Sequence, residues 1–149
     1  MYIHSPFPNT TYAVSLDEPG RILWVHKSKQ SAAARSMACC DVVNRGLAYW
    51  PGDEDREPLL FKTLLDGHVV AMDAATGEEI WKIENSDWRV GSTLTIAPFV
   101  VKDMVIVGSS GAELGVRGYV TAYDVKTGEQ IWRAYATGPD EDILLAEDF

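Results

Sequence analysis

Two adjacent cysteines are the first feature of this sequence that could do chemistry. Cys39 and Cys40 are the only cysteines among 149 residues, so a zinc site of four thiolates is excluded. Two free buried thiols are the simplest interpretation of the pair alone. The alternative is a disulfide between neighbours, but adjacent Cα atoms lie about 3.8 Å apart across a trans peptide, whereas disulfides prefer roughly 5.5–6 Å. Such a ring would be strained, and strain of this kind is usually retained where it serves a functional site.

Polar residues in later segments could bind a ligand. Arg45 lies five residues after Cys40, and taken alone it reads as an arginine on a strand surface. A guanidinium stays charged and can pair bidentately with anions. Glu113 alone reads as a solvated loop carboxylate. Thr95 and Ser110 carry hydroxyls, which alone indicate little because hydroxyls are common on strands.

An internal repeat indicates which elements carry these residues. Segment 67–81 reads GHVVAMDAATGEEIW and segment 118–132 reads GYVTAYDVKTGEQIW, at an offset of 51 residues. A looser copy at 12–24 reads YAVSLDEPGRILW, with Asp17 expected to start a turn that is one residue shorter. Each copy predicts a hairpin, because a β-branched and aromatic run ends at an aspartate that can start a turn and a glycine accepts positive φ.

Two further strand-like runs lie between successive hairpins, roughly at 45–50 and 59–64 and again at 93–100 and 104–109. Four strands in each period, with no convincing helical periodicity, predict an all-β propeller made of four-stranded blades. The tryptophans of the repeat, Trp24, Trp81 and Trp132, are expected to pack between neighbouring sheets rather than to take part in chemistry.

Composition limits the classes of partner. The net charge of −9 and pI near 4.7 argue against nucleic acid as a partner, because binding phosphates requires a basic face. No apolar run is long enough for a transmembrane segment, and the N-terminus does not read as a secretory signal peptide. Both ends of the sequence read as cut rather than finished, so a fragment of a larger protein is expected.

Longer motifs resemble a known family. The repeat A-x-D-x-x-T-G-x-x-x-W resembles the tryptophan docking motif of quinoprotein propellers. ACCDVVNRGLAYW at 38–50, VGSTLT at 90–95 and GSSGAELGVRG at 108–118 resemble the large subunit of bacterial methanol dehydrogenases that use pyrroloquinoline quinone (PQQ). The resemblance covers essentially the whole chain, with the acidic loop at 53–57 as its least distinctive part.

The family forms eight-bladed propellers, so the resemblance implies a partial PQQ-repeat propeller domain over 1–149, with about two to two and a half blades. The expected division is a blade end at 1–30, blades at 38–84 and 90–136, and the start of a further segment at 137–149.

The resemblance also implies roles for the residues introduced above. Cys39 and Cys40 would form a vicinal disulfide that packs against the face of PQQ, which implies an oxidising compartment. Arg45 would bind an anionic oxygen of PQQ. The remaining expected cofactor contacts are hydroxyls and backbone N–H groups that reach the PQQ carboxylates, from Thr95, Ser110, Gly111 and Ala112.

A metal and a reaction are implied as well. Glu113 would ligate calcium or a lanthanide ion, which would act as a Lewis acid. The parent protein would be a periplasmic enzyme that oxidises a primary alcohol, with methanol as the expected substrate, and passes electrons to a c-type cytochrome. It could also form a homodimer or bind a small subunit.

No residue of this chain can be assigned as the catalytic base, so the isolated chain is predicted to be inactive. Two alternatives remain open at this point. One is a quinoprotein dehydrogenase for ethanol or another alcohol. The other is a non-enzymatic propeller scaffold, which would have no use for a strained cysteine ring or a placed carboxylate.

Overall fold

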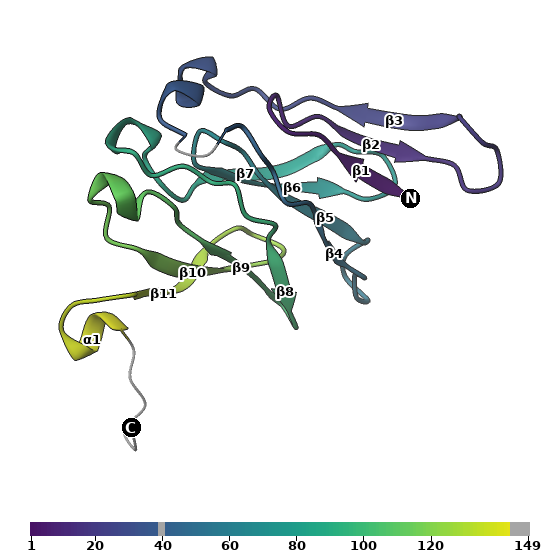
Figure 1. The fold of residues 1–149 in the computed structure, drawn as a ribbon. Coiled ribbons are helices and arrows are strands. Elements are labelled where there is room, and N and C mark those ends of the chain that lie inside the picture. Colours follow the sequence, from purple (N-terminus) through teal and green to yellow (C-terminus); the bar gives the residue numbers. More distant parts are fainter. Residues whose placement is uncertain (39–40, 144–149) are drawn as a thin grey trace.

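Three antiparallel sheets dominate the computed structural model, which describes residues 1–38 and 41–143 (Figure 1). The first sheet contains β1 (Tyr2–His4), β2 (Thr11–Val14) and β3 (Ile22–His26). The second contains β4 (Ala48–Trp50), β5 (Leu59–Thr63), β6 (His68–Asp73) and β7 (Glu79–Glu84), and the third contains β8 (Phe99–Val101), β9 (Met104–Gly108), β10 (Tyr119–Asp124) and β11 (Gln130–Tyr135). The prediction of an all-β architecture is therefore confirmed.

Helical segments are short. They are three 3-10 turns, η1 (Ala32–Ser36), η2 (Trp88–Val90) and η3 (Ala112–Leu114), and one helix near the end of the described chain, α1 (Asp140–Ile143). Within the described ranges, no helix has the length and apolar character needed to cross a membrane.

The repeated turn forms through its aspartate and glycine. Asp73 Oδ1 accepts the backbone N–H groups of Ala75 and Thr76 at 2.9 and 2.8 Å, and Asp124 makes the equivalent bonds in the next copy. Gly77 then adopts a φ of 74°, a conformation that residues with a Cβ rarely adopt. The local sequence thus fixes where β6 ends and β7 begins.

The first hairpin differs from the sequence prediction. Trp24 pairs with Ala13 in the ladder, and this register places Ser15 rather than Asp17 at the start of the turn. Ser15 Oγ accepts the backbone N–H groups of Asp17 and Glu18 at 3.2 and 3.0 Å. A serine hydroxyl performs the same local bonding as the aspartate, so the turn can start two residues before Asp17. As a result, the turn is one residue longer than in the other copies, not shorter.

The repeated tryptophans connect neighbouring sheets. Trp24 Nε1 of the first sheet donates to the carbonyl of Ala74 at 3.3 Å, and Trp81 Nε1 of the second donates to the carbonyl of Val125 at 3.0 Å. Each ring lies over the turn glycine of the next repeat, where a Cβ on Gly77 would be 2.5 Å from the Trp24 ring. Both tryptophans therefore pack between sheets, as predicted.

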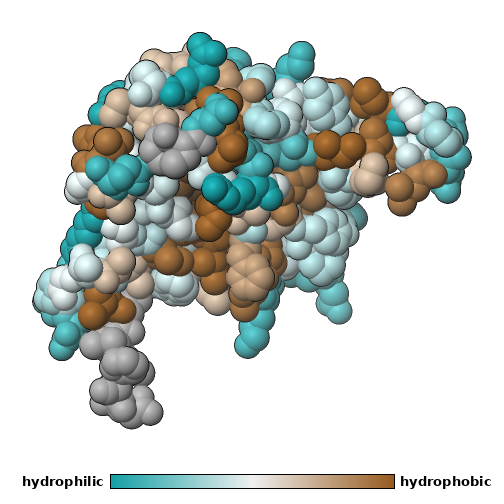
Figure 2. Space-filling model, viewed as in Figure 1, coloured by the Kyte–Doolittle hydropathy of each residue, from teal (hydrophilic) through white to brown (hydrophobic). Residues whose placement is uncertain are grey.

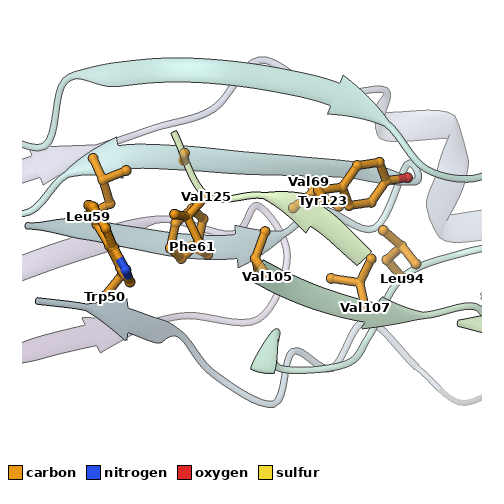
Figure 3. Close-up of a cluster of buried hydrophobic side chains, with 10 residues drawn as sticks. Trp50, Leu59, Phe61, Val69, Leu94, Val105, Val107, Tyr123 and Val125 are labelled. Atoms are coloured by element: carbon orange, nitrogen blue, oxygen red, sulfur yellow. The ribbon is translucent and has the colours of Figure 1, made fainter. Parts of the chain in front are cut away.

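The largest apolar core lies between the second and third sheets (Figure 3). Burying a valine, leucine or phenylalanine side chain of this core stabilises the fold by about 1.5–3 kcal/mol. The core holds the loops at the ends of these two sheets in a fixed relation. Its buried members are Trp50, Leu59, Phe61, Val69, Ala71, Leu94, Val105, Val107, Tyr123 and Val125.

Not all apolar side chains are covered. Figure 2 shows apolar residues at the surface over β4 and β8, which are edge strands of the second and third sheets. Tyr49 and Phe99 on these strands are exposed. The loops described below precede β8 and follow β9, at one end of the third sheet.

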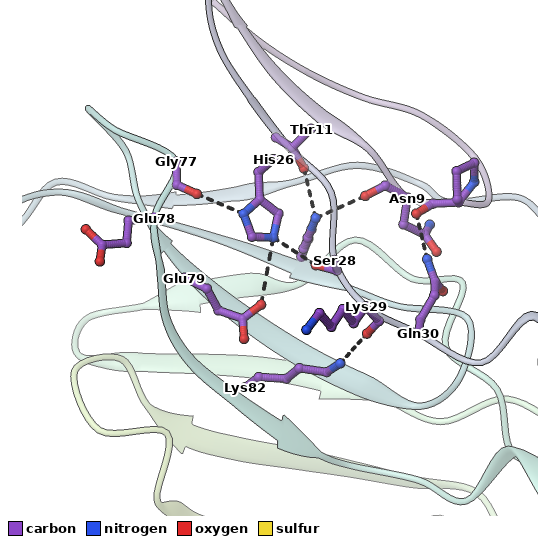
Figure 4. Close-up of polar contacts among 12 residues, drawn as sticks. Asn9, Thr11, His26, Ser28, Lys29, Gln30, Gly77, Glu78, Glu79 and Lys82 are labelled. Atoms are coloured by element: carbon purple, nitrogen blue, oxygen red, sulfur yellow. Dashed lines mark hydrogen bonds and ion pairs between the residues drawn. The ribbon is translucent and has the colours of Figure 1, made fainter.

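The contact between the first and second sheets is more polar. Lys62 of β5 is completely buried, and its ammonium donates to the carbonyl of Asn9 at 3.0 Å and to Thr11 Oγ1 at 3.3 Å. His26 of β3 lies beside it, with Nδ1 2.8 Å from the carbonyl of Gly77 and Nε2 3.8 Å from the Glu79 carboxylate (Figure 4). A buried amine without a directly bonded carboxylate makes this interface sensitive to pH.

We expect the free energy of unfolding to rise between about pH 7 and pH 10.5 because of Lys62. Burial is the main cause that lowers the Lys62 pKa from 10.5 to about 7; Glu79 opposes this shift and Lys82 adds to it. Between these pH values the unfolded lysine is protonated while the folded one is largely neutral. The unfolded state then binds more protons, and stability increases with pH.

Chemical denaturation at pH 7 and at pH 10 measures this effect. In the Lys62→Met variant, the free energy of unfolding should rise less steeply with pH, by up to the contribution of one bound proton. Equal slopes for the variant and the wild type would contradict the prediction.

Candidate cofactor site

Three loop segments meet around one hollow at the end of the second and third sheets. Its volume is about 240 Å³, and its walls come from residues 38 and 41–45, from 93–95 and from 109–118. A second hollow of about 280 Å³ adjoins it and shares residues of the same segments. The structure thus brings together six residues predicted from sequence to bind a cofactor or metal, which are Arg45, Thr95, Ser110, Gly111, Ala112 and Glu113. The other two, Cys39 and Cys40, lie outside the described residues.

Arg45 lies on an irregular segment that precedes β4, not on the strand predicted to begin there. The strand starts only at Ala48, because Gly46 has a φ of 129° and its N–H is bonded by the side chain of Asn44 at 2.9 Å. The exposed Arg45 side chain reaches across to the segment that precedes β8. Its Nη1 donates to the carbonyl of Thr95 at 3.1 Å and to Thr95 Oγ1 at 2.8 Å.

Thr95 also lies outside a strand. We expected a strand over 93–100, but β8 begins at Phe99. Proline 98 has no N–H to give to a ladder, and the carbonyls of Thr93 and Thr95 are bonded to other segments. The carbonyl of Thr93 accepts the N–H of Ser110 at 3.3 Å, so this segment packs against the turn that carries Gly111 rather than pairing with β9.

The hydroxyls of the hollow differ in what they can donate. Thr95 Oγ1 accepts from Arg45, so its own proton can be donated to a ligand. Ser110 Oγ donates to the carbonyl of Thr93 at 2.5 Å and lies 3.0 Å from Thr93 Oγ1. Ser110 can therefore donate to a ligand only if it releases that carbonyl, and otherwise it serves as an acceptor.

Glu113 is presented by a tight turn that requires glycine. Gly111 has a φ of 107°, and a Cβ at this position would lie 2.3 Å from the carbonyl oxygen of Gly91. The chain then forms η3, which carries the exposed Ala112 and Glu113. The first amides of a helical turn have no carbonyl partner within that turn, so the N–H groups of Gly111 and Ala112 are suited to an anionic oxygen.

Two residues that sequence reasoning missed also line the hollow. Thr93 is buried and lies two residues before Thr95, a spacing that could have indicated a shared face. Asp41, with a φ of 70°, adds a second carboxylate to the lining of the hollow, which also includes Glu113. In residues 1–38 and 41–143 there is no cluster of three or more metal-binding side chains. A hard cation such as calcium usually takes about six to eight oxygen ligands, so it would need further ligands here.

Comparison with known proteins identifies the family. The family model described as the β-propeller domain of glucose/ethanol/alcohol dehydrogenases, named for PQQ, matches residues 1–147. This chain belongs to that family. The resemblance to quinoprotein dehydrogenases inferred from the sequence motifs is confirmed.

Individual relatives are methanol dehydrogenases. The chain is 73 % identical over 149 residues to methanol dehydrogenase (cytochrome c) subunit 1 of Paracoccus denitrificans, which covers 100 % of this chain and 24 % of that relative. It is 51 % identical over 150 residues to a lanthanide-dependent methanol dehydrogenase of Methylacidiphilum fumariolicum, with the same coverage of both chains. The chain therefore spans only 24 % of the length of these curated relatives.

A solved structure shows the same fold. A europium-containing methanol dehydrogenase aligns with a TM-score of 0.93 and 51 % sequence identity, over 99 % of this chain and 25 % of that one. The sheets of this chain thus have the arrangement of the corresponding part of that solved structure.

Proposed function

We propose that this chain is a section of a PQQ-dependent alcohol dehydrogenase that oxidises a primary alcohol to an aldehyde. Methanol is the proposed substrate. A c-type cytochrome would accept the electrons, and the enzyme would act in the periplasm. The observation that carries the proposal is that Arg45, Thr95 and the 110–113 turn, which come from three separate segments, line one hollow. Relatives named for methanol and cytochrome c support the substrate and the electron acceptor.

The chemistry of the hollow fits PQQ, which carries carboxylates and supplies two-electron redox chemistry when bound. Arg45 offers a guanidinium that stays charged and can pair with an anionic oxygen. The Thr95 hydroxyl accepts from Arg45, and its own proton remains available to donate to a ligand beside it. Ser110 and the N–H groups of Gly111 and Ala112 provide polar groups on the facing turn.

We propose that Cys39 and Cys40 form a vicinal disulfide against one face of the cofactor. Their sequence neighbours, Ala38 and Asp41, both line the hollow, which supports a place for the pair near the ligand. A disulfide would also agree with a periplasmic enzyme, because that compartment is oxidising.

We further propose that Glu113 ligates calcium or a lanthanide ion. Its carboxylate has the oxygen chemistry that hard cations prefer, and it lines the same hollow as Asp41. The ion would supply Lewis acidity at the site. The remaining ligands and the base would come from residues outside this chain, in a propeller to which blades 38–84 and 90–136 contribute. A homodimer or a small subunit could complete the assembly.

Reconstitution tests the proposal. The whole protein that carries this chain, freed of cofactor, should bind PQQ stoichiometrically and oxidise methanol with an artificial dye acceptor after addition of PQQ and either calcium or a lanthanide. The 149-residue chain alone should show no such activity. Failure of the whole protein to bind PQQ would disprove the proposal, while a preference for ethanol or another alcohol would replace methanol as the substrate.

A further inference from the structure

One buried threonine connects the two loop segments that carry Arg45 and Thr95. Thr63 is the last residue of β5, and its side chain is completely buried behind the hollow. Its Oγ1 donates to the carbonyl of Ile96 at 2.6 Å, and so fixes the segment that carries Thr95. Thr63 itself is not among the residues that line the two hollows.

The other segment is bound to the same residue. Asn44 Nδ2 donates to the Thr63 carbonyl at 2.9 Å and lies 3.4 Å from Thr63 Oγ1. The other end of the Asn44 amide, Oδ1, accepts the N–H of Gly46 at 2.9 Å. Asn44 thus holds the residues on both sides of Arg45 against the end of β5.

The need for such a connection follows from the local structure. Neither Arg45 nor Thr95 lies on a strand, so no ladder fixes their spacing. Among the described residues, the one backbone bond that joins the two segments runs from the Arg45 N–H to the Thr95 carbonyl at 3.2 Å. A long arginine side chain loses considerable conformational entropy when it is ordered on a ligand. Support from a buried residue reduces that cost by organising the site before the ligand arrives.

We propose that Thr63 and Asn44 are positioning residues that set the spacing of Arg45 and Thr95 for an anionic ligand. This inference rests on the proposed PQQ function for the identity of the ligand, but not for the connection itself. The two residues act through Arg45 and Thr95 and do not touch the ligand.

The first measurement needs no cofactor. In the cofactor-free whole protein, hydrogen exchange followed by mass spectrometry should show faster exchange of the Arg45 amide in Thr63→Val and Asn44→Ala, by about tenfold. Thr63→Ser keeps the hydroxyl and should exchange like the wild type. Thr121→Val is the matched control, because Thr121 is equally buried but its hydroxyl accepts from Arg133 Nε at 2.9 Å, away from the hollow.

The second measurement is the dissociation constant for PQQ, read from quenching of protein fluorescence. Thr63→Val and Asn44→Ala should each weaken binding by about tenfold, while Thr63→Ser and Thr121→Val stay within about twofold of the wild type. Wild-type affinity and exchange in both Thr63→Val and Asn44→Ala would overturn the inference, as would equal effects from Thr121→Val. A wild-type protein that binds no PQQ would instead overturn the proposed function, and the exchange rates would still decide the connection.

Discussion

Replacing Arg45 with methionine is expected to weaken PQQ binding by the whole protein by roughly 10- to 100-fold. A hydrogen bond to a charged group contributes about 1.5–3 kcal/mol, and methionine removes both the charge and the fork of donors. The side chain is exposed and its bonds to Thr95 join two loops, so its loss should change stability little. Titration of the cofactor-free protein with PQQ, followed by fluorescence, measures the effect.

Two further variants make this result specific. Arg45→Lys keeps the positive charge without the planar fork and should bind PQQ with intermediate affinity. Arg21→Met removes an exposed arginine that pairs with Glu18 in the first hairpin, far along the chain from the hollow. If Arg45→Met binds PQQ as tightly as Arg21→Met, the role assigned to Arg45 is wrong.

The blade units could be predicted because their signals are local and repeated. Asp73 and Gly77 form their turn with bonds between near neighbours, and the same residue types recur 51 positions later. Trp81 follows at a fixed distance and meets the next sheet. Two segments with identical internal spacing are strong evidence of a repeated structural unit, because each residue type then occupies the same place in the local structure.

The loops between the blades were harder to predict. The run 93–100 has the alternation of a strand, but Arg45 and Ser110 donate hydrogen bonds to the carbonyls of Thr95 and Thr93 in its first half. These carbonyls therefore do not pair with a neighbouring strand. In the first hairpin, Ser15 replaced the expected aspartate because either side chain can accept the same N–H groups. Local propensity cannot express such competition.

Residues that support the site from behind gave no signal at all. Thr63 reads as an ordinary strand threonine, and its importance arises only because Asn44 and the Ile96 carbonyl meet it in three dimensions. Lys62 reads as a solvent-facing residue, yet it is buried by the first sheet. Motifs in the loops identified residues that line the hollow, whereas the supporting contacts required the structure.

Replacing Gly67 with alanine is expected to lower the free energy of unfolding by about 4 kcal/mol or more. Gly67 has a φ of 90°, and a Cβ there would lie 1.9 Å from the carbonyl oxygen of Ser86. The obstacle is backbone, so no side-chain rotation can relieve the overlap. The carbonyl of Gly67 also accepts the N–H groups of Asn85 and Ser86 at 2.8 and 3.2 Å, which fixes the end of β7.

The damage should extend to the contact with the third sheet. The side-chain oxygen of Asn85 accepts the hydroxyl of Tyr123 at 2.8 Å, and its carbonyl accepts from Tyr119 and Arg133 at 2.7 and 3.1 Å. Any shift that makes room for a Cβ at Gly67 moves Asn85, and it therefore disturbs three bonds across the interface between the sheets.

Gly20→Ala separates the overlap from backbone strain. Gly20 has a similar φ of 84°, but a Cβ there would meet nothing within 4 Å, so only the cost of a left-handed residue remains, about 1–2 kcal/mol. Equilibrium denaturation of both variants in guanidinium compares the two costs directly. Equal losses would mean that the turn at Gly67 moves away from Ser86 freely, and the close backbone approach would then have no role in joining β6 and β7 to the third sheet.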